Sequence, residues 1–246
     1  MHYVRIASSL FQILTLVLGI ALANGPHAKA QEATPNAADY AVAFAGSWLV
    51  FDERYAGEKP CRIQLEAGQQ PLQAITQDCL LALAEVKFWR IEAGQLQLLT
   101  ASGPFARLGG TTGRVSGWDT AGRPLVLDRD TGNGAVDPVN FARQAKGCWF
   151  LGYSSQCATS GQTLRPAASK ARICTVVDLR LRAEARSESA VVKVLPAQTC
   201  TATEVCVTTV NGPWCFIRFD AGTGWVRQHV LRHDEWPVLT FVAEAG

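Results

Sequence analysis

The sequence has few of the side chains that enzymes most often use for their chemistry. Of its four histidines, only His229 and His233 lie beyond residue 30. No Walker loop or dinucleotide-binding fingerprint occurs, and the stretch Gly152-Tyr153-Ser154-Ser155 lacks the second glycine of a nucleophile elbow. The carboxylates of Asp52 and Glu53 are adjacent, so on a strand they point to opposite faces. We therefore expect no enzyme, with no catalytic residue, no cofactor and no small-molecule substrate.

Concentrated positive charge is also missing. The chain has 23 Lys and Arg residues and 21 Asp and Glu residues. Without Arg5 and Lys29, which lie in a segment that we expect to be removed, 21 basic residues balance 21 acidic ones. No dense run of Lys or Arg occurs, although neutralising a phosphate backbone needs one. We therefore expect no nucleic-acid partner.

Spacings typical of metal ligands are weak throughout. The cysteines include no CxxC pair, which a reduced zinc site would use. On a helix His229 and His233 would share one face and could bind zinc, but they follow a pattern that ends in a short turn, which favours a solvated terminus. The stretch Asp128–Asp137 resembles the start of a calcium loop, yet its spacing is off by one residue and its twelfth position is Val139. We expect no metal site and interpret this stretch as a polar loop.

Residues 1–30 resemble an export signal. Polar residues at the start precede the mostly apolar run Leu10–Ala23, and Ala28-Lys29-Ala30 offers the small-x-small pattern that signal peptidase accepts. The apolar run is short for a bilayer span of about 20 residues, although an uncleaved anchor is the alternative. We expect cleavage after Ala30, with Ala23 as a second choice, and a periplasmic or secreted protein.

Eight cysteines follow this segment, and an even number behind an export signal predicts a disulfide framework. Cys148 and Cys157 bracket a short aromatic stretch, and a local disulfide between them would close that loop. The other six are Cys61, Cys79, Cys174, Cys200, Cys206 and Cys215.

The spacing of apolar residues and turn signals in the stretch 46–130 is typical of an all-β domain. Val50, Ile63 and Leu65 are apolar at strand spacing, with polar residues between, and Gly-containing turn signals recur at short intervals. This pattern predicts an antiparallel barrel or sandwich of short strands. Asp78–Leu83 is the stretch that best fits a helical turn.

An ordered set of motifs in this first domain resembles the alkaline metalloproteinase inhibitor family, which includes related bacterial outer-membrane lipoproteins. The resemblance covers about residues 40–130. It implies an eight-stranded antiparallel barrel, a Cys61–Cys79 disulfide, and inhibition of secreted zinc metalloproteases in the periplasm. The motifs are Gly46-x-Trp48, Cys61-Arg62-Ile63-x-Leu65, Asp78-Cys79-Leu80, Trp89-Arg90 and Gly94-x-Leu96-x-Leu98.

In that family the segment ahead of the barrel enters the protease cleft and approaches the zinc. By position, this tail falls within residues 31–45. A free amino terminus or a carbonyl can ligate zinc, and a chain that enters backwards presents no productive scissile bond. Between the tail and the barrel, Tyr40, Val42 and Phe44 begin an alternation that could dock on the barrel. The expected protease-contacting residues are Gln31, Glu32, Ala33, Thr34 and Pro35.

A second domain is predicted at residues 171–234, after a linker at 131–170 and before a C-terminal tail at 235–246. The dipeptide Asn211-Gly212 between alternating apolar runs predicts a hairpin. The domain resembles the bacterial SH3 family, whose small β-barrels often bind cell-wall peptides or extended polypeptides. The motifs that support this resemblance are Asp178-Leu179-Arg180-x-Arg182-Ala183, Pro213-Trp214-Cys215-x-Ile217-Arg218 and Gly222-Thr223-Gly224-Trp225-Val226.

The resemblance suggests a groove formed by Leu179, Trp214 and Trp225 for peptidoglycan or an extended peptide, although both tryptophans could equally be core residues. The four cysteines of this domain allow three pairings. Cys206 and Cys215 flank the predicted hairpin, which favours Cys206–Cys215 and leaves Cys174–Cys200, but the hairpin register is not determined by the sequence alone.

Overall fold

The computed structural model of this protein describes residues 37–132, 138–164, 170–220 and 222–244. The expected signal peptide (1–30) and the expected protease-contacting residues (31–35) lie outside the described residues. Strands dominate, and the two α-helices of the described part are α1 (Ala37–Phe44) and α2 (Pro138–Lys146), so the predicted all-β class is confirmed. No helix in these ranges has both the length and the apolar character needed to span a membrane.

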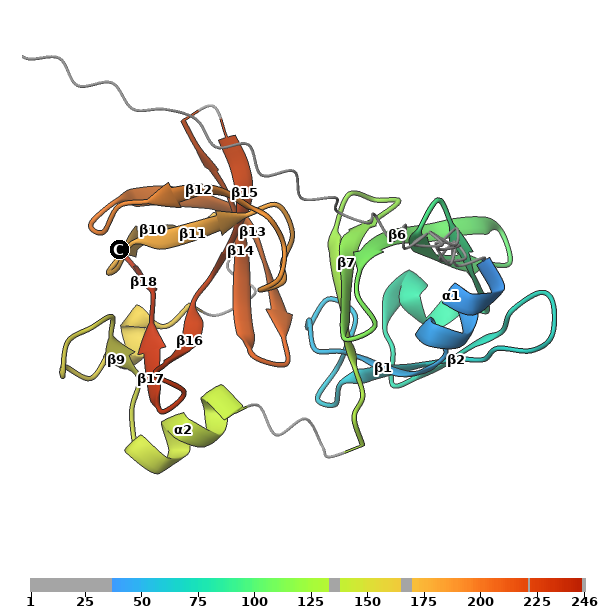
Figure 1. Cartoon of the computed structure of the whole chain (residues 1–246), viewed down its shortest axis with the longest axis horizontal. Coiled ribbons are helices and arrows are strands. Elements are labelled where there is room, and N and C mark those ends of the chain that lie inside the picture. The colour runs from blue at the N-terminus through green and yellow to red at the C-terminus, as the bar shows by residue number, and fades with distance from the viewer. Residues whose placement is uncertain (1–36, 133–137, 165–169, 221, 245–246) are drawn as a thin grey trace, which may run out of the picture. The chain divides into compact units, whose positions relative to one another are not determined.

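Eight antiparallel strands form a nearly closed barrel (Figure 1), in the order β3-β2-β1-β8-β7-β6-β5-β4. A bridge between Gln73 and Phe88, and a 2.8 Å hydrogen bond from the Ala74 N–H to the Lys87 carbonyl, bring the two edge strands together. The predicted eight-stranded barrel is confirmed. Its strands are β1 (Gly46–Val50), β2 (Cys61–Leu65), β3 (Ala74–Gln77), β4 (Phe88–Glu92), β5 (Gln95–Thr100), β6 (Gly103–Gly110), β7 (Arg114–Asp119) and β8 (Pro124–Arg129).

Alternating apolar residues build the core of this barrel. In β2, Ile63 and Leu65 are buried while Arg62 is exposed, as the two-residue period of a strand requires. Full burial of such a side chain contributes about 2 kcal/mol relative to exposure. The same core holds Trp48 and Trp89, both fully buried. The sequence alternation therefore predicted correctly which face of the barrel strands is buried.

The Cys61–Cys79 disulfide, which the family resemblance implied, joins the start of β2 to the segment after β3. The predicted helical turn at Asp78–Leu83 is displaced toward the C-terminus, because the 3-10 helix η1 covers Leu81–Glu85. Cys79 forms an isolated bridge with Ala56 and is tied to β2 by its disulfide. These contacts hold the chain extended at Cys79, so the helical turn begins only after it.

The expected alternation of Tyr40, Val42 and Phe44 is wrong in its period, because all three residues lie in the helix α1. Ala41 and Phe44, three residues apart, are buried, whereas Val42 is 71% exposed. The Phe44 ring stacks on Trp48 at a centroid distance of 6.1 Å. The segment therefore docks on the barrel through one face of a helix.

A second sheet has seven strands in the order β12-β11-β15-β14-β13-β10-β18, and a three-stranded sheet has the order β16-β17-β9. The second sheet comprises β10 (Arg172–Thr175), β11 (Leu179–Arg182), β12 (Val191–Leu195), β13 (Cys200–Thr209), β14 (Gly212–Phe219), β15 (Gly222–Arg227) and β18 (Phe241–Ala243). The small sheet comprises β9 (Phe150–Leu151), β16 (His229–Arg232) and β17 (Trp236–Leu239), and the 3-10 helix η2 covers Ser160–Gln162.

The expected C-terminal tail at 235–246 is wrong in its described part, since β17 and β18 lie there. Val238, Leu239 and Phe241 are buried, and Phe241 pairs with Thr175 of β10. The apolar run from Trp236 to Val242 thus completes two sheets. The predicted linker also contributes, because its short strand β9 runs parallel to β17.

The remaining disulfides are Cys148–Cys157, Cys174–Cys200 and Cys206–Cys215, and no described cysteine is free. Cys206 faces Cys215 directly in the β13–β14 ladder, as Cys174 faces Cys200 between β10 and β13. The favoured pairings are confirmed. Four disulfides indicate an oxidising compartment, such as the periplasm or the extracellular space.

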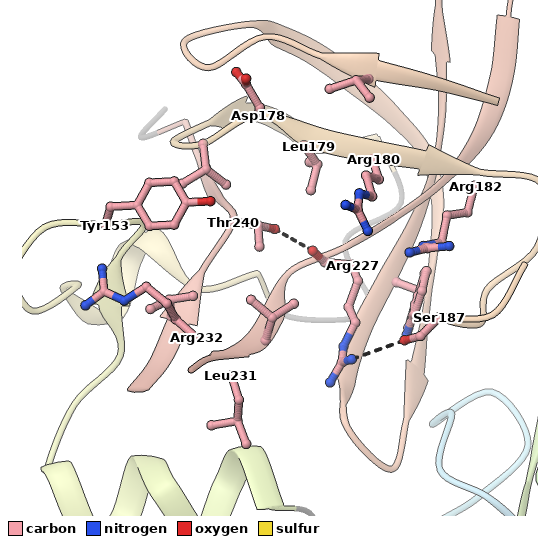
Figure 2. A pocket seen from close by; sticks show the side chains of 15 residues that line it. Tyr153, Asp178, Leu179, Arg180, Arg182, Ser187, Arg227, Leu231, Arg232 and Thr240 are labelled. Atoms are coloured by element: carbon pink, nitrogen blue, oxygen red, sulfur yellow. Dashed lines mark hydrogen bonds between the residues drawn. The ribbon is translucent and has the colours of Figure 1, made fainter. Parts of the chain in front are cut away.

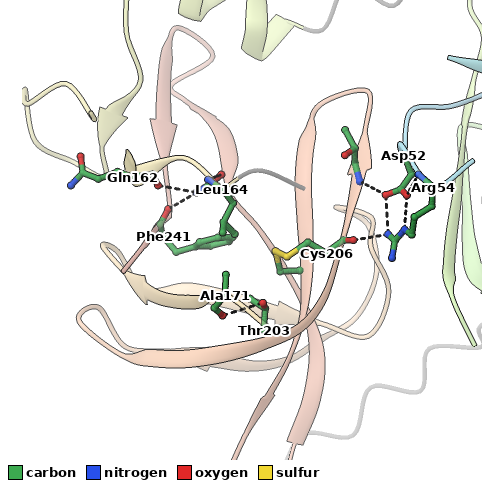
Figure 3. The surroundings of a disulfide bond; sticks show 11 residues. Asp52, Arg54, Gln162, Leu164, Ala171, Thr203, Cys206 and Phe241 are labelled. Atoms are coloured by element: carbon green, nitrogen blue, oxygen red, sulfur yellow. Dashed lines mark hydrogen bonds and ion pairs between the residues drawn. A yellow bond between two sulfur atoms is a disulfide. The ribbon is translucent and has the colours of Figure 1, made fainter. Parts of the chain in front are cut away.

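The β13–β14 hairpin contacts the barrel through its backbone. Asp52, which follows β1, accepts a hydrogen bond from the N–H of Thr208 at 3.0 Å. Arg54 forms an ion pair with the same carboxylate and donates to the Cys206 carbonyl at 2.6 Å (Figure 3). One barrel carboxylate therefore accepts the amide of Thr208 and orients the guanidinium that binds the carbonyl of Cys206 in the same strand.

A second carboxylate of the barrel binds the hairpin tip in the same way. Asp128 of β8 forms a buried ion pair with Arg114 of β7 and accepts the N–H of Val210 at 2.8 Å. Arg114 also donates to the side-chain oxygen of Asn211 at 3.1 Å. Asp128, which the sequence placed at the start of a polar loop, is thus a buried contact residue.

Candidate functional site

A groove of about 540 Å³ lies between β11 and the chain from Arg227 to Thr240 (Figure 2). Tyr153, from the loop closed by the Cys148–Cys157 disulfide, lies at one end of it, and Ser187 lies at the other. The groove is lined by Tyr153, Val177, Asp178, Leu179, Arg180, Arg182, Ser187, Val194, Trp214, Arg227, Val230, Leu231, Arg232, Val238 and Thr240. We call it the arginine groove.

Four arginines and one carboxylate give the groove its charge. Arg182 donates to the Ser189 carbonyl at 2.6 Å, and Arg232 lies 5.8 Å from the ring centroid of Tyr153. Figure 2 shows Arg180 and Arg182 extending from β11 toward the strand that carries Arg227. Burial and the neighbouring guanidinium of Arg180 lower the pKa of Arg182. The groove is therefore a site of concentrated positive potential.

The apolar part of the lining includes two of the three residues expected to form a binding groove. Leu179 and Trp214 both line it, although Trp214 is only 1% exposed and so belongs to its floor. Tyr153, at 75% exposure, offers a free aromatic ring at the rim. This combination of apolar floor, exposed ring and cations can hold an extended chain that has both apolar and charged groups.

Trp225, the third expected groove residue, is not among the groove-lining residues. It is 5% exposed and lies 5.3 Å from Phe216 and 5.8 Å from Trp118 of β7, measured between ring centroids. Trp118 is also 5.6 Å from Phe216. An aromatic cluster between β7 of the barrel and strands β14 and β15 therefore covers Trp225, which packs rather than binds.

The sequence reasoning overlooked the arginines. The alternation of Leu179, Arg180, Leu181 and Arg182 was itself a signal, because it puts two guanidinium groups on the face opposite the buried leucines. The other wall could not be found in this way, since Arg232 and its neighbours were assigned to the end of the domain.

The barrel presents a second feature next to the expected inhibitory tail. The Phe44 carbonyl, at the end of α1, accepts hydrogen bonds from Trp48 Nε1 at 2.9 Å and from Arg129 at 3.1 Å. Arg129 also donates to the Ala45 carbonyl at 2.6 Å, and its guanidinium carbon lies 5.0 Å from the Trp48 ring centroid. Gln31–Pro35 lie outside the described residues, but the helix that follows them is fixed to the barrel.

The side chains considered above as possible metal ligands do not come together. His229 lies in β16 and is stacked on Trp149 at 4.0 Å, whereas His233 lies in the turn that follows, so the two share no helical face. Asp130 accepts a hydrogen bond from Ser47 at 3.1 Å and pairs with a surface arginine. Within the described ranges, no group of three or more His, Cys, Asp or Glu side chains could hold a metal ion.

A comparison of the chain with models of known protein families finds no match, and a comparison with curated proteins finds none either.

Proposed function

We propose that this protein is an exported protease inhibitor in which the segment ahead of α1 enters the protease cleft while α1 and the barrel rest on its rim. The observation that carries the proposal is the attachment of α1 to the barrel by Arg129, Trp48 and Phe44. A segment that leaves a fixed helix has fewer conformations to lose on binding than one that leaves a free chain. The resemblance of residues 40–130 points to secreted zinc metalloproteases as targets.

The outward face of α1 supports this orientation. Val42 is 71% exposed and Tyr40 is 39% exposed, although Ala41 and Phe44 beside them are buried. Two exposed apolar side chains next to the expected tail offer contacts to the rim of a protease cleft, where Tyr is a frequent source of binding energy. The protein would therefore act by binding, with the tail and α1 as one continuous contact surface.

The first testable prediction concerns inhibition. The protein starting at Gln31 should slow secreted zinc metalloproteases, and a variant starting at Ala37 should inhibit far less, because it retains α1 but lacks the tail. Val42→Asp should weaken inhibition about tenfold by placing a charge on the contact surface. Phe141→Asp is the matched control, because Phe141 is 65% exposed on α2.

Initial cleavage rates measured against inhibitor concentration test whether the protein and its variants inhibit the protease. No inhibition of any zinc protease at a large excess would overturn the proposal. Equal potency of the variant starting at Ala37 would exclude the tail mechanism. A serine protease included in the same series tests whether inhibition depends on zinc.

A second function is favoured by the arginine groove. We propose that the region resembling a bacterial SH3 domain holds an extended polymer, a peptide or a cell-wall peptide, in this groove. The supporting observation is a groove of about 540 Å³ with the apolar floor residues Leu179 and Trp214 and the exposed ring of Tyr153. Retention on purified peptidoglycan without protease inhibition would favour this function over the first.

A further inference from the structure

Three of the four arginines in the arginine groove form no ion pair within the described residues. Elsewhere in the described chain, Arg54 and Arg114 each form an ion pair with an aspartate, and so does Arg123. No ion pair joins Arg180, Arg182 or Arg232 to a carboxylate of the described residues. Clustered guanidinium groups repel one another, and a bound anion would remove that repulsion.

The single carboxylate of the groove already has a structural role. Asp178 accepts a hydrogen bond from the Ala197 N–H at 3.0 Å, and it lies at the rim (Figure 2). This contact ties the start of β11 to the turn after β12. The lining contains four arginines and one carboxylate, so its positively charged groups outnumber its negatively charged ones.

Neutral acceptors orient the guanidinium groups of Arg182 and Arg232 without cancelling their charge. Arg182 donates to the carbonyl of Ser189 at 2.6 Å, and Arg232 donates to the carbonyl of Gly152 at 3.4 Å. A guanidinium group oriented in this way retains donors for a carboxylate, which it binds in a two-pronged geometry.

We propose that the arginine groove selects extended peptides rich in carboxylates, whose acidic side chains or terminal carboxylate pair with Arg180, Arg182 and Arg232. The proposal rests on the second proposed function, that the groove holds a polymer. Beside the cations, apolar side chains of the same peptide pack on Tyr153 and on Val194, which is 50% exposed and pairs with Arg180 across the β11–β12 ladder. A peptide fits better than a polyphosphate, because a phosphate chain would leave this apolar surface uncovered.

The test uses labelled short peptides and fluorescence anisotropy with the full exported chain. One peptide alternates Asp with Leu, a second replaces each Asp by Asn, and a third replaces each Asp by Lys. The acidic peptide should bind at least tenfold more tightly than the amide peptide, and added salt should weaken it. Arg180→Gln and Arg232→Gln should each weaken it by roughly fivefold.

Arg90→Gln is the matched control, because it removes the same charge from an exposed position on β4 of the barrel. Circular dichroism and the melting temperature show whether each variant is folded. Arg180 is exposed and its side chain makes no hydrogen bond within the described residues, so its variant should have the same melting temperature as the wild type.

The outcomes separate the inference from the function on which it rests. Equal binding of the acidic and amide peptides would overturn the selection of carboxylates and leave the binding groove standing. No binding of any peptide or of peptidoglycan would overturn both. Tighter binding of inorganic polyphosphate than of the acidic peptide would replace the peptide by a phosphate polymer.

Discussion

At the residue scale, His229 links stability to pH. Burial, followed by the nearby cations Arg227 and Arg143, lowers the pKa of His229 from 6.5 to about 3. The unfolded chain takes up a proton on this imidazole below pH 6.5, whereas the folded chain does not until about pH 3. The free energy of unfolding therefore falls as the pH falls through this window, by about 1.4 kcal/mol per pH unit well inside it.

The variant His229→Phe should flatten this dependence, because Phe keeps a ring against Trp149 and cannot take up a proton. Urea denaturation at several pH values between 6.5 and 4 measures the slope, and the slope rather than the absolute stability is the test. The exposed His233→Phe serves as the control and should behave as the wild type. An unchanged slope in His229→Phe would show that the imidazole is protonated in the folded protein.

At the element scale, the β13–β14 hairpin depends on one glycine. Thr209 pairs with Gly212, so Val210 and Asn211 form the connection and Gly212 follows it with φ 97°. The predicted hairpin is thus present, but its turn lies one residue before the predicted Asn211-Gly212, and Gly212 with its positive φ begins β14. A Cβ atom at this position would lie 2.3 Å from Nδ1 of His229.

Gly212→Ala should therefore lower the free energy of unfolding by roughly 3 kcal/mol, since it combines the strain of positive φ with a clash against a stacked ring. Gly122→Ala is the matched control, because Gly122 also has positive φ, at 72°, but has open space where its Cβ would be. The control should lose only about 1 kcal/mol. Denaturant titration of both variants tests the difference, and equal losses would mean that the ring of His229 moves aside freely.

The individual elements show which parts of the fold can be predicted from the sequence and why others cannot. Strands that bury one face were predicted correctly, because Ile63 and Leu65 lie on the side of β2 that faces the core and the period of two makes this visible. The register-dependent pairing of Cys206 with Cys215 was also correct. The helix α1 escaped, because eight residues containing Tyr40, Val42 and Phe44 fit both periods, and only packing of Phe44 on Trp48 decides between them.

At the scale of the whole molecule, what escaped prediction is contact between distant segments. The arginine groove needs the return of the chain through β17, where the sequence suggested a tail. Trp225 was expected in that groove. Its packing partner Trp118 is distant in the sequence, so no local pattern predicts their contact. Asp128 was weighed as part of a loop, although its partner Arg114 is only fourteen residues away, because the hairpin amide that completes its environment belongs to a distant strand.

These distant contacts predict that the barrel and the second sheet unfold together. Asp52 and Asp128 bind hairpin amides, and Trp118 packs on Phe216 and Trp225, so loosening either sheet exposes buried groups of the other. Differential scanning calorimetry of the chain starting at Gln31, with its disulfides intact, should show one transition. Trp118→Asp should split it into two or lower its midpoint by several degrees, because a carboxylate replaces an aromatic ring in an apolar cluster.

Ile75→Asp is the control, since Ile75 is exposed on β3 and has no part in these contacts. Two transitions in the wild type, or an unchanged single transition in Trp118→Asp, would show that the aromatic cluster does not couple the sheets.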